Sequence, residues 1–148
     1  LFDAAAAIAG IRQTVSYEAQ AAIELEALAE PAETGYYPLQ LSGELLDPAP
    51  MLRALVADLR AGVSLPIVSA RFHNGIAEAV GMVCRALRDQ HGLEQVVLSG
   101  GVWQNMFLLR RAASRLEQDG FEVLVHRQVP ANDGGLALGQ ALIAAAQP

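Results

Sequence analysis

The sequence predicts an α/β fold in which helices pack on a mixed sheet. The 148 residues are 53% hydrophobic but only 5% aromatic, with many alanines, and this composition favours closely packed helices over an all-β fold. A long stretch with helical periodicity occupies the middle of the chain, and two strand–helix units follow it in succession. The length suits a single domain that can bury a substantial core.

Before these units, the chain contains four predicted helices and one predicted hairpin. Helices are expected over residues 2–9 and over 16–29, the second with Ser16 as its cap. Residues 36–41 are predicted to form a strand paired with 44–46, and a third helix follows over 49–61. The longest helix is expected over 64–90, because apolar residues recur there every three or four positions. These residues are Phe72, Ile76, Val80, Val83 and Leu87.

The two strand–helix units fill the rest of the chain. The first is a strand over 95–98 and a helix over 104–118, whose Arg110, Arg111 and Arg115 are expected to face water. The second is a strand over 121–125 and a helix from Asn132 or Asp133 to residue 146. This last helix is apolar on nearly every side, so it is predicted to be buried.

The turn between residues 98 and 105 is predicted to bind a phosphate or a nucleotide. Gly100 and Gly101 have no Cβ atom, so a ligand can approach their backbone closely. The helix that begins near Asn105 is expected to direct its unpaired N–H groups toward the same ligand. Alone, a Gly-Gly turn after a strand has little specificity.

The second loop is expected to lie beside this turn. Two parallel strands joined by a short crossover are neighbours, and both of their loops then emerge at the carboxyl edge, where α/β sheets bind ligands. Asp133 in that loop is explained equally well as a helix cap or as a ligand of a divalent metal ion beside a phosphate. Gly134 and Gly135, which follow it, favour close approach of a metal or ligand.

Charge and composition exclude several classes of function. The net charge of −6 and the isoelectric point near 4.9 argue against a nucleic-acid partner. No apolar stretch is long enough to span a membrane, and no signal peptide is expected at the start of the chain. The single cysteine, Cys84, is predicted to be a packing residue and indicates a reducing, cytoplasmic location. His73 lies in an unusually polar stretch, so both a core role and a functional role stay open.

Several stretches together resemble one protein family. Residues Val97–Asn105 and His126–Gln140 closely resemble the C-terminal end of the HypF carbamoyltransferases, which act in [NiFe]-hydrogenase maturation. Residues 1–4, 16–26 and 70–74 are also similar to that family, so the resemblance extends over nearly the whole chain. It implies the C-terminal half of an actin-like (ASKHA, ribonuclease H-like) domain, within a larger multidomain protein.

The resemblance also implies a reaction and a set of site residues. Such proteins use carbamoyl phosphate and ATP to form carbamoyl adenylate, and they transfer the carbamoyl group to the C-terminal cysteine of HypE. Gly100, Gly101 and Asn105 would match the nucleotide-binding turn, and Asp133 the carboxylate ligand of a divalent metal ion. Asp3 and Glu18 fall where relatives contact the nucleoside, which is a looser correspondence.

Departures from the family pattern limit what this chain can do alone. The pair of histidines that supplies the family's other metal ligands is absent, as are the domains that process carbamoyl phosphate and form the adenylate. The chain alone is therefore expected to be inactive, and its uncovered apolar face makes a homodimer an expectation. The alternatives are another carbamoyl or threonylcarbamoyl transferase, or a non-catalytic nucleotide-binding or docking module.

Overall fold

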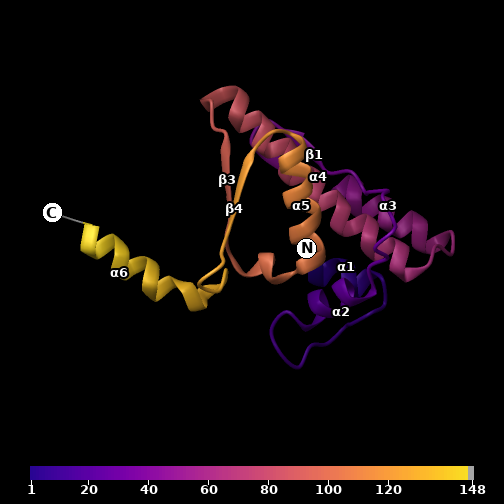
Figure 1. The fold of residues 1–148 in the computed structure, drawn as a ribbon. Coiled ribbons are helices and arrows are strands. Elements are labelled where there is room, and N and C mark those ends of the chain that lie inside the picture. The colour runs from indigo at the N-terminus through magenta and orange to yellow at the C-terminus, as the bar shows by residue number, and fades with distance from the viewer. Residues whose placement is uncertain (147–148) are drawn as a thin grey trace.

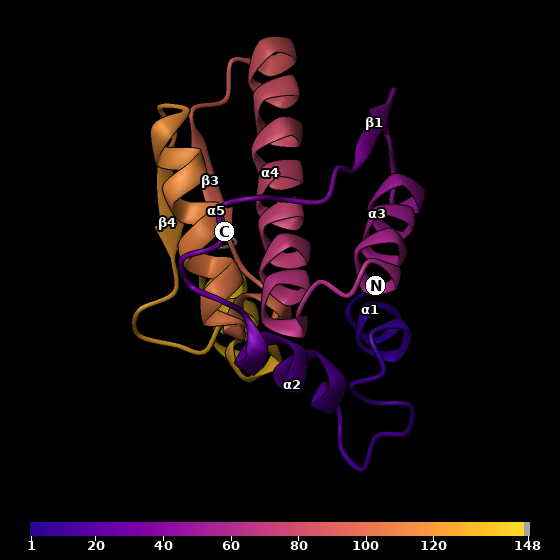
Figure 2. The same ribbon diagram turned by 90° about the vertical axis from the view of Figure 1, so that its right-hand side faces the viewer.

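The fold is organised around α4 (Leu65–His91), a helix of 27 residues. The structure is a computed structural model, and it describes residues 1–146. Figure 2 shows α4 standing between two groups of elements. On one side lie α1 (Phe2–Ile8) and α3 (Ala49–Arg60), with α2 (Gln20–Leu28) at the lower end. On the other side lie α5 (Met106–Gln118) and a small sheet.

The strands form two separate pairs. β3 (Gln95–Leu98) and β4 (Glu122–Val125) are parallel, with Val97 opposite Leu124, as the two predicted strand–helix units require. β1 (Gln40–Ser42) and β2 (Leu45–Asp47) form an antiparallel hairpin, with Leu41 opposite Leu46. The expected α/β class is confirmed, with parallel and antiparallel pairing in different sheets.

The core consists of apolar clusters on opposite sides of α4. Phe72 of α4 is fully buried in a cluster with α1, α2 and α3, and Leu116 of α5 is buried with Leu98 at the end of β3. The first cluster contains Ala5, Ala6, Ala21, Leu25, Tyr37, Met51, Leu55, Val68 and Phe72. α4 ends at Gly92, whose positive φ of 68° is the left-handed conformation that terminates many helices. The predicted helix over 64–90 is thus confirmed within a residue.

The chain before α2 and the chain before β1 differ from the predictions. α2 begins at Gln20 because Ala19 adopts a left-handed conformation, and Ser16 donates its backbone N–H to the Gln20 side chain instead of capping the helix. Residues 36–39 are unpaired because Tyr37 is held against α4. Its N–H donates to the Arg71 carbonyl oxygen at 3.1 Å, and its hydroxyl donates to Asp58 at 2.8 Å.

Two predictions about exposure are wrong. α6 (Leu136–Ala146) contains no buried residue, and Figure 1 shows it extending away from the other helices. The reason is that no element among residues 1–146 covers it. Arg111 and Arg115 do not simply face water, because Arg111 donates to the Pro31 carbonyl oxygen at 2.6 Å and Arg115 pairs with Glu78 at 3.1 Å. Within the described residues, no helix is long and apolar enough to cross a membrane.

A glycine in α4 permits the closest approach of another segment. A Cβ atom on Gly75 would lie 2.2 Å from the Tyr37 carbonyl oxygen, whereas a Cβ atom on Gly81 would meet only side-chain atoms, at 3.1 Å or more. We expect Gly75→Ala to lower the free energy of unfolding by about 1–3 kcal/mol, because backbone must move. Gly81→Ala should stay within about 1 kcal/mol, since helix propensity offsets the contact. Urea unfolding of both variants measures this, and equal losses would contradict the assignment.

Candidate functional site

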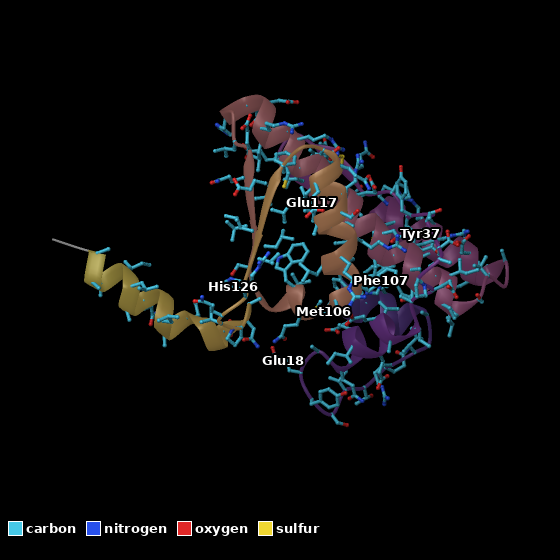
Figure 3. The ribbon with its side chains drawn as sticks, in the orientation of Figure 1. Glu18, Tyr37, Met106, Phe107, Glu117 and His126 are labelled. Atoms are coloured by element: carbon cyan, nitrogen blue, oxygen red, sulfur yellow. The ribbon has the colours of Figure 1, made fainter. Side chains whose placement is uncertain are left out.

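The two strand–helix loops meet at the carboxyl edge of the parallel sheet, as predicted. Gly100 donates its N–H to the carbonyl oxygen of Ala131 at 2.7 Å. A second link joins the Ser99 hydroxyl to Nε2 of His126 at 2.8 Å, and Figure 3 shows His126 at the end of β4. The loops that carry Gly100 and Asp133 are therefore hydrogen-bonded to each other.

The two glycines of the turn differ in what the fold requires of them. Gly100 has φ 111° and ψ 164°, a backbone conformation that is essentially restricted to glycine. Gly101 has no such requirement, and a Cβ atom built on it would meet no protein atom within 4 Å. The backbone of Gly101 is consequently open to a ligand, while Gly100 shapes the turn.

The helix α5 does not present its N–H groups to a ligand in the way the sequence suggested. A short 3-10 helix, η1 (Gly101–Gln104), lies between the turn and α5. Asn105 caps α5 by accepting the Leu108 N–H at 2.8 Å, and the Phe107 N–H donates to the Glu26 carboxylate of α2 at 3.1 Å. Because the first N–H groups of a helix lack partners within it, those of Gly101 and Val102 at the start of η1 are the better phosphate donors. A phosphate bound at this turn would therefore meet η1 before α5, and the phosphate site itself stays a prediction.

His73 lies directly behind this turn. Its side chain is fully buried, and its Nε2 atom lies 2.9 Å from the Asn105 side-chain nitrogen. Its Nδ1 atom lies 2.7 Å from the carbonyl oxygen of Ser69. Burial lowers the pKa of His73 below its usual value, although the Ser69 carbonyl and the nearby Glu26 carboxylate oppose this effect. The imidazole is therefore neutral at pH 7, and it contacts the residue that ends the turn.

Asp133 is exposed at the start of another short 3-10 helix, η2 (Asp133–Gly135). Asn132, not Asp133, provides the cap, because its side chain accepts the Gly134 N–H at 3.1 Å. A Cβ atom on Gly135 would lie 2.8 Å from the Pro130 carbonyl oxygen, so packing within the loop explains that glycine without a ligand. Among residues 1–146 no group of three or more metal-ligating side chains occurs, so Asp133 by itself does not form a metal site.

The two predicted nucleoside contacts lie on the N-terminal part of the chain. Asp3 is exposed in the first turn of α1, and Glu18, which Figure 3 labels, is exposed on the loop before α2. Within the described residues, no hydrogen bond or ion pair joins either carboxylate to the Gly100–Asn105 turn. The structure leaves both carboxylates accessible, and their role stays a prediction.

A groove of about 850 Å³ lies elsewhere, between α2, α4 and α5. Glu26, Asn74 and Arg110 line it, and none of the six predicted site residues does. The predicted site is thus an exposed edge rather than an enclosed pocket. An exposed edge of this kind agrees with a site to which other parts of a longer protein contribute the remaining groups.

Sequence reasoning missed Glu26 and left His73 unassigned. The acidic residues of its helix are typical of a solvated face, but Glu26 is half-buried and accepts the Phe107 N–H at the start of α5. The Ser69–His73 spacing of four on an otherwise apolar helix face was the available signal. Cys84 is half-buried beside Leu98 and Leu116, and burial raises the pKa of its thiol, which agrees with a packing role.

The lowered pKa of His73 predicts a pH dependence of stability. The unfolded chain binds a proton near pH 6.5 and the folded chain only at lower pH, so the free energy of unfolding falls as the pH drops below about 6.5. The loss from one group is at most about 1.4 kcal/mol per pH unit. His73→Gln has no such proton, so the stability difference between wild type and variant should shrink from pH 7.5 to 5.5. Urea unfolding at both pH values measures it, and a constant difference would contradict a buried neutral imidazole.

Residues 1–140 match the family described as Carbamoyltransferase, Kae1-like domain, second subdomain. Carbamoyltransferase HypF of Rhodobacter capsulatus is 43% identical over 151 residues, which cover 99% of this chain and 19% of that protein. Carbamoyltransferase HypF of Synechocystis is 35% identical over 147 residues, which cover 96% of this chain and 18% of that protein.

Solved structures agree with these relatives. A crystal structure of full-length HypF in its phosphate- and nucleotide-bound form superimposes with a TM-score of 0.92 and 42% identity. The match covers 97% of this chain and 19% of that one. HypF from T. kodakarensis, at 23% identity and a TM-score of 0.79, supports the fold. The chain spans about a fifth of the length of these relatives, and it belongs to the HypF carbamoyltransferase family, as its Kae1-like second subdomain.

Proposed function

We propose that this chain is the nucleotide-binding part of a HypF-type carbamoyltransferase. The observation that carries the proposal is the hydrogen bond between Gly100 and Ala131, which fixes an open glycine turn beside the loop of Asp133. The relative that is 42% identical was crystallised with phosphate and nucleotide bound. The nucleotide is ATP or carbamoyl adenylate. The full protein would form the adenylate from carbamoyl phosphate and ATP in domains that lie outside these residues.

In the proposed transfer step, this chain binds the phosphate of the leaving group. A thiolate from the C-terminal cysteine of a HypE-type acceptor attacks the carbamoyl carbon, a C–S bond forms, and the C–O bond to phosphate breaks as AMP leaves with the electron pair. The thiol proton passes to solvent. The N–H groups of Gly101 and Val102 can donate to the phosphate oxygens, which gain charge as AMP leaves. Their contribution is to bind and orient the leaving group.

Asp133 is proposed as one ligand of a divalent metal ion shared with the phosphate. Mg²⁺ in phosphate sites usually has one or two carboxylate ligands together with phosphate oxygens and water. The single exposed carboxylate of Asp133 fits a site with one carboxylate ligand. The other ligands would come from the phosphate, from water and from groups outside residues 1–146. We therefore assign no step of the reaction to the metal.

The exposed apolar residues of helix α6 suggest that another part of a larger protein covers it. Leu136, Leu138, Leu142 and Ile143 are each between 49% and 64% exposed. An apolar surface of this kind is normally covered by another part of the protein or by a second copy. A homodimer of the isolated chain stays a prediction, and the chain alone is expected to produce no AMP from ATP and carbamoyl phosphate.

Binding of MgATP to the chain tests the nucleotide assignment. We expect Asp133→Asn to abolish the part of the affinity that depends on Mg²⁺ while stability is unchanged, because Asp133 is exposed. Calorimetric titration with ATP, with and without Mg²⁺, measures this. A non-catalytic docking module would show no binding that depends on Asp133. Mass spectrometry can identify the acceptor that the full protein modifies. An acceptor other than a HypE-type cysteine would favour the alternative of another carbamoyl or threonylcarbamoyl transferase.

Gly101→Ala separates ligand binding from folding. Since its Cβ atom would meet no protein atom within 4 Å, the free energy of unfolding should change by no more than about 0.5 kcal/mol. A nucleotide in contact with the backbone would meet the methyl group, and its dissociation constant should rise about tenfold. Gly81→Ala, remote on α4, serves as the control. Unchanged affinity in Gly101→Ala would remove the turn from the site.

A further inference from the structure

The imidazole of His73 is enclosed where α4, α1 and the start of α5 meet. Its exposed fraction is 0%, and the rings of Phe2, Phe72 and Phe107 lie edge-on to it, with centroids 5.4 to 5.6 Å away. A buried polar ring in such surroundings is costly unless each nitrogen has a partner. The partners of the two nitrogens therefore indicate what the residue does.

Those partners determine which nitrogen carries the proton. The Ser69 carbonyl oxygen, 2.7 Å from Nδ1, can only accept, so Nδ1 must donate. In a neutral ring Nε2 then has no proton, and it accepts from the Asn105 side-chain nitrogen at 2.9 Å. This orientation of the Asn105 amide directs its oxygen at the Leu108 N–H, 2.8 Å away. Ser69, His73, Asn105 and Leu108 thus form one directed chain of hydrogen bonds from α4 to α5.

We propose that His73 is a positioning residue for the Gly100–Gly101 turn. Asn105 ends η1 and begins α5, so the orientation of its side chain decides where η1 stops and α5 starts. Glu26, from α2, accepts the preceding N–H of α5, that of Phe107. The inference rests on the proposed function, because it names a residue that supports the same nucleotide site from the interior.

His73 could act in two ways: its ring could only fill space among its neighbours, or its hydrogen bonds could hold Asn105 in place. Two substitutions separate these roles. In His73→Gln the amide oxygen can occupy the place of Nε2 and still accept from Asn105, but the bond to Ser69 is lost. In His73→Asn the amide nitrogen can occupy the place of Nδ1 and donate to Ser69, but the acceptor for Asn105 is lost. Both variants remove ring volume from the same site, so each is a matched control for the other.

Amide hydrogen exchange tests the hold on the turn without any ligand. In the 148-residue chain, exchange at Leu108 should accelerate roughly fivefold in His73→Asn, the effect expected when a helix loses its capping side chain. His73→Gln should stay within about twofold of wild type. Equal acceleration in both variants, or none in either, would overturn the proposal.

The affinity for MgATP tests the consequence for the site. We expect the dissociation constant to rise roughly fivefold in His73→Asn and to change little in His73→Gln, in parallel with the exchange rates. If wild type binds MgATP and the two variants bind it with the same affinity as each other, the positioning role is wrong while the proposed function stands. If wild type does not bind, the nucleotide assignment fails, and exchange at Leu108 still decides whether His73 holds the turn.

A measurement on the unmodified chain keeps the proposal testable if a variant does not fold. The ¹⁵N chemical shifts of the His73 imidazole distinguish its tautomers. A protonated Nδ1 and an unprotonated Nε2 at pH 7 are expected. A proton on Nε2 would overturn the proposal, because two donors would then face each other at Asn105.

Discussion

The close approach of other segments to α4 is the constraint on which the rest of the fold depends. α4 is buried along much of its length, and six of its buried residues are small: Ser69, Ala70, Gly75, Ala77, Ala79 and Gly81. A long helix that accepts neighbours on opposite sides can join two groups of elements that have little contact otherwise. The helical group α1–α3 and the βα group that carries the candidate site lie on opposite sides of this one helix (Figure 2).

This arrangement also explains the buried polar residues of α4. Close contacts leave little room for water, so a polar side chain there must find its partner in another segment. Asn74 donates to the carbonyl oxygens of Glu33 and Gly35 and holds the loop after α2, while His73 holds Asn105. These bonds are directional, whereas apolar contacts are not, so they determine which part of each segment lies against the helix. If His73 has the role proposed for it, the position of the Gly100–Gly101 turn is also set from inside the protein.

The sequence predicted the elements whose signals are local. Periodicity and turn residues gave the parallel pair β3–β4, the long helix α4 and the meeting of the two loops, which Gly100 and Ala131 confirm. It failed where a distant segment decides the outcome: Glu26 reaches α5 across 81 positions of the sequence, and His73 reaches Asn105 across 32. The burial of α6 was predicted from its composition, but burial also needs a covering surface, which residues 1–146 do not contain.

The proposed division of the site, between this chain and groups outside residues 1–146, has a physical explanation. One chain can arrange backbone donors such as Gly101 and Val102 by itself, because hydrogen bonds within the chain fix the turn. Backbone N–H groups carry no net charge, so no charged groups have to be brought together. A metal site differs, since several carboxylates or imidazoles gathered on a small exposed edge would repel one another or lose hydration unless the ion is present. Asp133 stands alone and exposed, so its charge costs little in the isolated fold. A protein that assembles such a site from two parts can keep each part stable without its ion, and the ion then binds only where both parts meet.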